Sequence, residues 1–190
     1  MVKKRTKRGS LARKNSASAL PFTANAEANE LIARNGTAFL IAMCLEQQVR
    51  SEKAMIGPYE LQLRVGHLDA RKIGALPPAR LDAVFRRVPA LHRFPGMMAK
   101  RVRELCGVIA RDYGNDGANV WAGVKDTREL YERFKTLPGF GQGKAGCSVR
   151  ILGKYAKLRL PGWQRYASDE DLPWEFKSGQ KVKLAPAARP

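Results

Sequence analysis

The sequence predicts an all-α protein, and three observations support that fold class. Apolar residues recur at intervals of three and four along most of the chain, which is the spacing of an amphipathic helix. No segment alternates apolar and polar residues with the period of two that a half-buried strand requires. Proline and glycine pairs at Gly57-Pro58, Pro77-Pro78 and Pro95-Gly96 interrupt the periodic stretches. We therefore expect helices joined by turns.

Eight helices are expected from this pattern, at residues 27–34, 37–48, 52–64, 69–75, 78–86, 97–113, 126–134 and 144–154. Thr37 and Ser51 are the expected N-caps of the second and third helices, because their hydroxyl groups can accept from free backbone N–H groups. The third helix is expected to bend or break at Gly57-Pro58, since proline removes a helical hydrogen bond. The helix at 97–113 is the longest and carries an apolar face.

The turn between the last two expected helices suits the binding of an anion. It reads Leu137-Pro138-Gly139-Phe140-Gly141-Gln142-Gly143-Lys144-Ala145. Pro138 ends the first helix, Gly139 and Gly141 permit backbone angles that other residues avoid, and Phe140 is expected to pack inward. The second helix then begins with free N–H groups and the positive end of its dipole beside Lys144, which favours a DNA phosphate. A plain Pro-Gly turn between packed helices would use the same residues.

The charge of the chain indicates a polyanionic partner. Its 35 basic and 17 acidic residues give a net charge of +18, with a pI of about 10.3. Residues 1–25 carry seven of the positive charges and no acidic residue, so the rest of the chain retains +11. Nucleic acid is the first candidate, although a ribosome-associated or general RNA-binding protein would share this balance.

No apolar run is long enough to cross a bilayer, and the basic N-terminus lacks the apolar segment of a secretory signal. We therefore expect an intracellular protein, in the cytoplasm or nucleoid, without a membrane partner. Composition divides the chain into a disordered basic arm at 1–25, a helical domain at 26–176 and a basic Pro/Ala-rich tail at 177–190. The arm is either a DNA tether or a solvated tail. We expect a monomer.

The cysteines and histidines predict no cofactor and no metal. Cys44, Cys106 and Cys147 lie far apart in helical segments, and three thiols cannot supply the four thiolates of an iron–sulfur cluster. We expect all three to be buried and reduced. His67 and His92 lack neighbouring metal ligands, and packing or capping roles are more common for such residues.

Three stretches resemble the helix-hairpin-helix DNA glycosylases, in the order that this family has them. The family hairpin typically reads L-P-G-[V/I]-G-x-K-x-A, and the matching positions here are Leu137, Pro138, Gly139, Gly141 and Ala145, with Phe140 as the hydrophobic residue. The stretch Leu45-Glu46-Gln47-Gln48-Val49-Arg50-Ser51 is similar to the GQQ-x-S helix end that those enzymes push into the duplex. The stretch from Arg93-Phe94 to Val102 looks like the one leading into the family's long middle helix.

The resemblance covers about residues 27–163 and implies a helix-hairpin-helix DNA glycosylase-like fold, with double-stranded DNA as partner. The residues that it implies as DNA contacts are Gln47, Gln48, Leu137, Pro138, Gly139, Phe140, Gly141, Gln142, Gly143 and Lys144. Gln47 and Gln48 would fill the space that a flipped nucleotide leaves in the stack. An ordinary exposed helix end is the alternative for these two glutamines.

Two positions depart from the family pattern. The lysine that forms a Schiff base in bifunctional members is replaced by Gly143, and Lys144 lies one residue later, about 100° further around the helix. Lys144 is therefore expected to contact phosphate, and the enzyme to cleave the N-glycosidic bond without cutting the strand.

The second departure concerns the catalytic aspartate of the family, whose position falls at Leu160 to Gly162, where no acidic residue occurs. Asp169 and Asp171 are the expected catalytic residues, and Glu46 is another candidate. A solvated acidic loop is the alternative reading of Asp169 and Asp171.

These observations predict a monofunctional DNA glycosylase of base-excision repair, a hydrolase acting on a damaged or modified base. The alternative is a non-enzymatic protein that binds DNA lesions or structures on the same scaffold. A basic helical DNA-associated protein without lesion preference is a third interpretation. The sequence does not indicate which base is removed.

Overall fold

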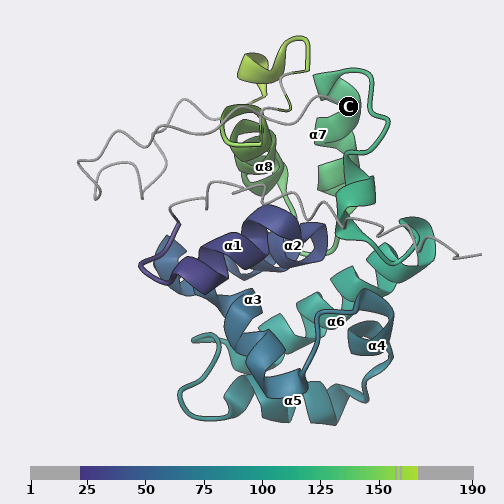
Figure 1. The fold of residues 1–190 in the computed structure, drawn as a ribbon. Helices are drawn as coiled ribbons and strands as arrows, with labels where there is room; N and C mark the ends of the chain where they lie inside the picture. The colour runs from purple at the N-terminus through teal and green to yellow at the C-terminus, as the bar shows by residue number, and fades with distance from the viewer. Residues whose placement is uncertain (1–21, 157, 159, 167–190) are drawn as a thin grey trace, which may run out of the picture.

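The computed structural model describes residues 22–156, 158 and 160–166, and every regular element among them is a helix (Figure 1). The elements are α1 (Ala26–Arg34), α2 (Gly36–Leu45), α3 (Ser51–Val65), α4 (Ala70–Ala75), α5 (Pro78–Arg86), α6 (Pro95–Asp112), η1 (Gly117–Val120), α7 (Thr127–Thr136), α8 (Gln142–Lys154) and η2 (Trp163–Arg165). The all-α prediction is confirmed for this part of the chain. None of its helices combines the length and the apolar character needed to cross a membrane.

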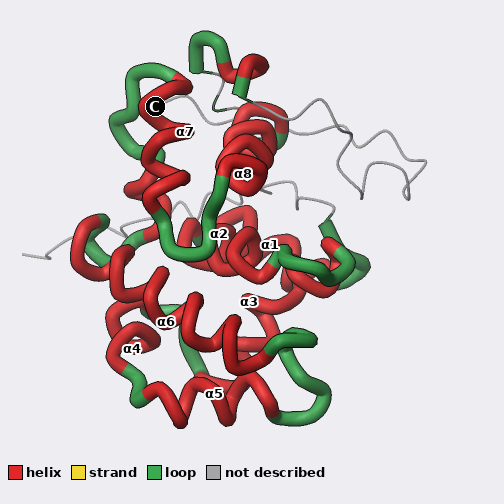
Figure 2. The backbone as a smooth tube through the Cα atoms, turned by 180° about the vertical axis from the view of Figure 1, so that it is seen from behind, coloured by secondary structure: helices red, strands yellow, loops and turns green. Residues whose placement is uncertain are grey.

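Helix α2 is the central element. All ten of its residues are buried, and the helix is apolar on every side, which requires partners all around it. Helices α7 and α8 lie on one side of the α1–α2 pair, and α3 to α6 lie on the other (Figures 1 and 2). The first half of the fold and the hairpin at its end therefore meet at α2.

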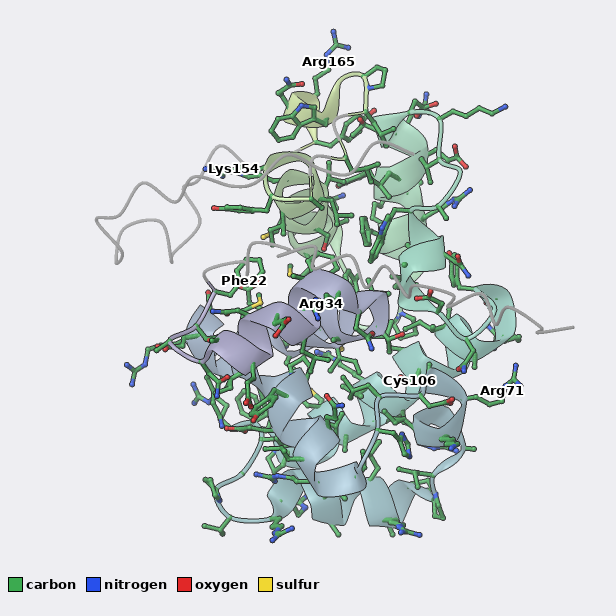
Figure 3. The ribbon with its side chains drawn as sticks, viewed as in Figure 1. Phe22, Arg34, Arg71, Cys106, Lys154 and Arg165 are labelled. Carbon is green, nitrogen blue, oxygen red and sulfur yellow. The ribbon has the colours of Figure 1, made fainter. Side chains whose placement is uncertain are left out.

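Helix α6 is the central helix of the part of the molecule formed by α3 to α6. Its buried face packs against α4 and α5 as well as α2, and Cys106 of that face lies inside this part of the molecule (Figure 3). A Cβ atom at Gly74 would lie 2.9 Å from the backbone nitrogen of Gly107, so α4 and α6 cross in close contact. Only glycine at position 74 permits this approach.

The N-terminus of α2 corrects the expected cap at Thr37. Asn35 is the N-cap, and its side chain accepts from the N–H of Ala38 at 3.0 Å. The Thr37 hydroxyl accepts instead from the buried N–H of Gly117, at 3.1 Å. A side chain at Gly36 would collide with the backbone of Ala118, so the first turn of α2 packs directly on η1.

Helix α3 runs without a break through Gly57-Pro58, so of the two outcomes expected there, a bend or a break, the break is wrong. Both residues are buried inside the helix, where Gly57 makes room for the side chain of Leu45. Packing on α2 therefore outweighs the hydrogen bond lost at Pro58. Ser51 is the first residue of α3 rather than its cap, and Arg50 is the N-cap without a side-chain hydrogen bond.

The folded part begins earlier than the predicted boundary at residue 26. Phe22 is 2% exposed, and its ring packs edge-on against Tyr155 at 6.0 Å between centroids. Asn25 caps α1 by accepting from the N–H of Ala28 at 2.9 Å. These contacts place residues 22–25 in the helical body, not in the arm.

The remaining parts of the prediction lie outside the described residues. They are residues 1–21 of the arm, the predicted domain end at 176, the tail at 177–190, and the predicted catalytic residues Asp169 and Asp171.

Candidate functional site

Helices α7 and α8 and the turn between them form the predicted helix-hairpin-helix. Helix α7 ends at Thr136, and Leu137 adopts an extended conformation before Pro138. The N–H of Phe140 donates to the carbonyl of Leu137 at 3.0 Å, which closes the turn. The loop between the two helices reaches toward α2 and α6 (Figure 2).

The apolar residues of the turn fix it to the core. Phe140 is 9% exposed, and its ring stacks on Phe134 of α7 at 6.1 Å between centroids and an interplanar angle of 10°. Leu137 is 2% exposed. Phe140 therefore packs inward as predicted. The buried side chains of Leu137 and Phe140 shape the turn, so among the predicted DNA contacts these two can offer only backbone atoms.

The two flanking glycines have different conformations. Gly139 has φ +82°, in the left-handed region, and its missing Cβ atom would lie 3.0 Å from Cys44 Sγ. Gly141 has φ −121°, an angle open to any residue, so the conformational freedom expected of both glycines is used at position 139 and not at position 141. A Cβ atom at Gly141 or Gly143 would meet no atom within 4 Å, which leaves the space around the start of α8 open.

This open space surrounds the N-terminal turn of α8. Gly141, Gln142 and Gly143 are exposed, and no side chain caps the helix. The first N–H groups of a helix have no intrahelical partner and lie at the positive end of the dipole. The hairpin therefore presents a row of free donors that a phosphate can approach closely.

The side chain of Lys144 does not face this space. Its Nζ donates to the carbonyl of Cys44, the next-to-last residue of α2, at 2.7 Å. Burial lowers the pKa of Lys144, and the nearby charge of Arg101 lowers it further. The ammonium group thus caps the negative end of the α2 dipole, and the phosphate contact expected of this side chain stays a prediction. The backbone N–H of Lys144 still lies in the first turn of α8.

Residues 46–50, which join α2 to α3, form what we name the glutamine loop. Helix α2 ends at Leu45, so the predicted helix end at Gln47-Gln48 lies in this loop. The side-chain oxygen of Gln47 accepts a hydrogen bond from Arg101 of α6. Gln48 is exposed and has φ +53°, an uncommon conformation for a residue with a side chain. Arg93 donates to its carbonyl at 3.3 Å.

His92 fixes the base of the glutamine loop. It is 2% exposed, its Nε2 bonds the carbonyl of Leu45 at 3.1 Å, and its Nδ1 accepts from the N–H of Phe94 at 3.0 Å. This pairing requires the neutral ring with its proton on Nε2. Burial lowers the pKa of His92 and thereby favours that neutral form. The capping role expected for an isolated histidine is thus observed.

Glu46 is the carboxylate of the glutamine loop. Its Oε1 accepts from the hydroxyl of Ser51 at 2.8 Å. Its negative charge acts on both Lys144 and Cys147, so the carboxylate lies in the region between the loop and α8. Among the catalytic candidates, Glu46 is the one within the described residues, and it lies beside the hairpin.

The three cysteines are free thiols. Cys44 and Cys106 are buried as predicted, whereas Cys147 is half-buried, so the prediction of burial is wrong for Cys147. Burial raises the pKa of Cys44 to about 11 and that of Cys147 to about 12, so both are protonated at neutral pH. No group of three or more metal-ligating side chains occurs within the described ranges.

Two predicted motifs, about 90 residues apart in sequence, meet at this place. Besides the Lys144 bond, Cys44 Sγ lies 4.0 Å from the carbonyl oxygen of Pro138. The glutamine loop begins two residues after Cys44. The structure therefore brings the start of the glutamine loop next to the hairpin, and Arg101, the partner of Gln47, packs against Gly139 of the turn.

The segment after α8 stays at the other end of the α7–α8 pair. Thr127, the first residue of α7, donates its hydroxyl to the carbonyl of Pro161 at 2.8 Å. The ring of Trp163 packs so closely on Gly153 that a Cβ atom there would lie 2.6 Å away. Lys154 and Arg165 mark this end of the molecule, remote from α2 (Figure 3). Positions 160–162 therefore lie far from the hairpin turn.

A groove of about 440 Å³ lies between α5 and α6. Its lining residues are Pro78, Ala79, Asp82, Gly96, Ala99, Lys100, Arg103 and Glu104. None of them is a predicted site residue.

Sequence reasoning missed three side chains that hold the site together, His92, Arg93 and Arg101. Arg93 and Arg101 fall within the third matching stretch, at positions 93–102, which was the one signal available for them. His92 immediately precedes that stretch. Their partners lie more than 40 residues away, so no local pattern could reveal the contacts.

No protein-family model matches this sequence, and no curated protein matches it either. One solved structure that the chain resembles is a trapped endonuclease III–DNA covalent intermediate, in an estranged-adenine complex. The TM-score is 0.46 and the sequence identity 18%, over 70% of this chain and 57% of that one. The match thus spans less than two thirds of that chain, and a similarity of this extent does not identify a family.

Proposed function

We propose that the chain binds double-stranded DNA through the hairpin and the glutamine loop and acts as a monofunctional DNA glycosylase of base-excision repair. The observation that carries the proposal is the meeting of these two motifs at the C-terminal end of α2, with Lys144 Nζ bonded to Cys44. The open N–H groups of α8 suit a phosphate of one strand. The glutamine loop beside them, with Gln48 and Arg50 exposed and Gln47 half-buried, suits insertion into the duplex.

The proposed chemistry starts with a flipped nucleotide. Extrusion of the base leaves a gap in the stack, which the flat polar side chains of Gln47 and Gln48 can fill. Cleavage of the bond between base and sugar develops positive charge on the sugar, which a carboxylate stabilises. Asp169 and Asp171 remain the proposed catalytic residues, with Glu46 as the candidate beside the hairpin. No cofactor is part of this mechanism.

Excision of damaged bases is the direct test. Duplexes that carry different damaged bases are incubated with excess protein, and abasic sites are revealed by alkali. A glycosylase without lyase activity gives cleavage only after alkali. Asp169→Asn or Asp171→Asn is expected to slow single-turnover excision while sparing binding, with each tenfold loss equal to about 1.4 kcal/mol of transition-state stabilisation. Full activity in both variants, together with a loss in Glu46→Gln, assigns catalysis to Glu46.

The absence of an amine at position 143 provides a second test. Gly143 is exposed, and its Cβ direction is open, so Gly143→Lys is expected to fold normally. Borohydride is expected to trap no covalent complex with the natural chain. It is expected to trap one with Gly143→Lys, because the amine then stands where the resemblance places it in bifunctional enzymes. Gln142→Lys adds the same charge one residue earlier and is the matched control. Trapping that requires Lys144 in the natural chain would contradict the monofunctional proposal.

A non-enzymatic lesion-binding protein is the second candidate function, and one observation favours it. Residues 160–162, where the resemblance places the catalytic aspartate, contain no acid and pack at the end of α7 and α8 remote from the hairpin. Tight binding to damaged duplexes with no excision of any base would establish this candidate over the glycosylase.

A further inference from the structure

The side-chain amide of Gln47 is held in a single orientation. A guanidinium group has N–H donors and no acceptor, so Arg101 can bond only the oxygen of the amide. Arginine also keeps its charge at every pH that proteins tolerate. The amide therefore cannot turn over to offer its oxygen to another partner without breaking this bond.

The amide nitrogen of Gln47 is left for a ligand. None of the described residues accepts a hydrogen bond from Gln47 Nε2. The nitrogen is also not a buried atom without a partner, so a ligand can reach it. Gln47 thus presents two N–H donors to a ligand, while its oxygen is turned toward Arg101. Gln48 differs, because Arg93 holds its backbone carbonyl and its exposed side chain has no described partner that fixes the amide.

Arg101 is itself positioned by the hairpin. A Cβ atom at Gly139 would lie 3.5 Å from Arg101 Cδ, so the turn packs along the stem of the arginine. The charge of Arg101 also acts on Lys144 and Cys44 at the junction of α2 and α8. The contact between Arg101 and Gln47 is therefore part of the packed junction and is in place before any DNA arrives.

We propose that Gln47 reads the base opposite the lesion as a hydrogen-bond donor, and that Arg101 is the positioning residue that sets this reading. The inference rests on the proposed function, because it requires the glutamine loop to enter the duplex. An unpaired cytosine offers two adjacent acceptors, N3 and O2, on its pairing edge. Guanine offers one acceptor there, O6, beside the donors N1–H and N2–H₂, and N2–H₂ also occupies its minor-groove edge, so it lacks a pair of adjacent acceptors on the pairing edge. Cytosine is thus the favoured opposite base and guanine the disfavoured one.

Binding to four duplexes tests the proposal. Each carries a tetrahydrofuran abasic analogue opposite one of the four bases, and affinity is measured by fluorescence anisotropy at fixed salt. The natural chain is expected to bind the cytosine duplex about tenfold more tightly than the guanine duplex, as one well-placed base contact provides. Gln47→Glu replaces the donor with an acceptor and keeps the Arg101 contact. This variant is expected to remove or reverse the ratio.

Arg101 variants separate positioning from general charge. Arg101→Met frees the amide to turn over and is expected to reduce the cytosine-to-guanine ratio to within about twofold, whereas Arg101→Lys, which keeps a donor, is expected to restore most of it. Lys100→Met removes a charge from the neighbouring exposed position and is expected to keep the ratio. Gln48→Ala is expected to weaken all four duplexes equally. Thermal unfolding verifies that each variant is folded.

Three results would overturn the inference. They are a natural chain that binds all four duplexes within twofold, a folded Arg101→Met variant with an unchanged ratio, and a Gln47→Glu variant that loses affinity equally for all four bases. The last result would place the amide on phosphate. If any of these results is obtained while the protein still prefers abasic over intact duplex, the inference fails and the proposed function survives. A natural chain without that preference overturns the proposed function and this inference together.

Discussion

Gly139 and Gly141 stand two residues apart in the hairpin, yet a side chain at each position would meet a different environment. At Gly139 it would meet Cys44 and Arg101 with the backbone in the left-handed region. At Gly141 it would extend into open space with an ordinary backbone angle. Position 139 therefore serves folding, whereas position 141 leaves open the space that the proposed phosphate contact requires.

Gly141→Val is expected to leave the fold intact and to weaken duplex binding by about tenfold or more, because the side chain covers donors that each contribute about 1.5–3 kcal/mol to a charged acceptor. Gly139→Val is expected to lower the free energy of unfolding by about 1–3 kcal/mol through backbone strain alone. Urea unfolding and anisotropy measure the two effects. Equal DNA affinity in a folded Gly141→Val variant would show that the start of α8 does not bind phosphate.

His92 gives the stability of the molecule a pH dependence. Burial holds its pKa in the folded state below the ordinary value of 6.5, so the unfolded chain takes up a proton first as the pH falls. The contribution of His92 to stability is therefore constant above about pH 6.5 and declines below it. We expect this decline in urea unfolding of the natural chain between pH 7 and 5.

His92→Gln is the control, because glutamine can bond the Leu45 carbonyl without titrating. The difference in unfolding free energy between the natural chain and this variant isolates the histidine from the carboxylates. If this difference did not change with pH, it would contradict the assignment of a neutral His92 ring bonded to Leu45 and Phe94.

At the scale of elements, α2 connects the hairpin to the rest of the fold. Its C-terminal carbonyls accept from Lys144 of α8 and from His92, which precedes α6. Positive or polar donors at a helix C-terminus compensate its dipole. The end of α2 is thus the point at which three elements are joined by specific polar contacts.

Lys144→Met tests this connection, because methionine keeps most of the stem and removes the donor. We expect the free energy of unfolding to fall by about 1–3 kcal/mol, as for a hydrogen bond from a charged group. The salt dependence of DNA binding is expected to stay unchanged. Lys100→Met removes an exposed cation and is the control for stability. Unchanged stability with a salt slope reduced by about one would restore the phosphate contact that the sequence predicted.

At the scale of the whole molecule, the basic arm and the helical body meet near Phe22. Truncation before Phe22 removes seven positive charges and keeps every residue that the structure describes. Truncation before Ala26 also removes the buried ring of Phe22 and the Asn25 cap. We expect the longer truncation to cost about 3 kcal/mol more, from the burial of one aromatic side chain and one helix cap.

Both truncated chains are expected to show the same flatter dependence of DNA affinity on salt, because counterion release follows the number of phosphates contacted. Preference for damaged over intact duplex is expected to remain. Anisotropy across a salt series and thermal unfolding provide the two measurements. Equal stability of the two truncations would place the start of the body at Ala26, and loss of lesion preference would make the arm part of the recognition surface.

The sequence by itself determined the helices and the hairpin. Periodicity and breakers located the eight α-helices of the part of the chain that the structure describes, because each depends on residues a few positions apart, and Pro78–Arg86 has the predicted bounds. The left-handed Gly139 and the inward Phe140 followed from turn chemistry. The errors at Thr37, Ser51 and Pro58 arise from contacts with distant or neighbouring segments. The Thr37 hydroxyl bonds η1, the Ser51 hydroxyl bonds Glu46 of the glutamine loop, and packing on Leu45 keeps the helix unbroken at Gly57-Pro58.

Only the tertiary structure decided how the site is assembled. Lys144 lies beside exposed glycines in the sequence, yet its side chain bonds a carbonyl 100 residues earlier. Arg101 orients Gln47 across 54 residues, and Pro161 is bonded to Thr127 at the far end of the hairpin helices. The direction of a side chain depends on which groups surround it in space. Those neighbours come from distant segments, and a sequence pattern reports only nearby ones.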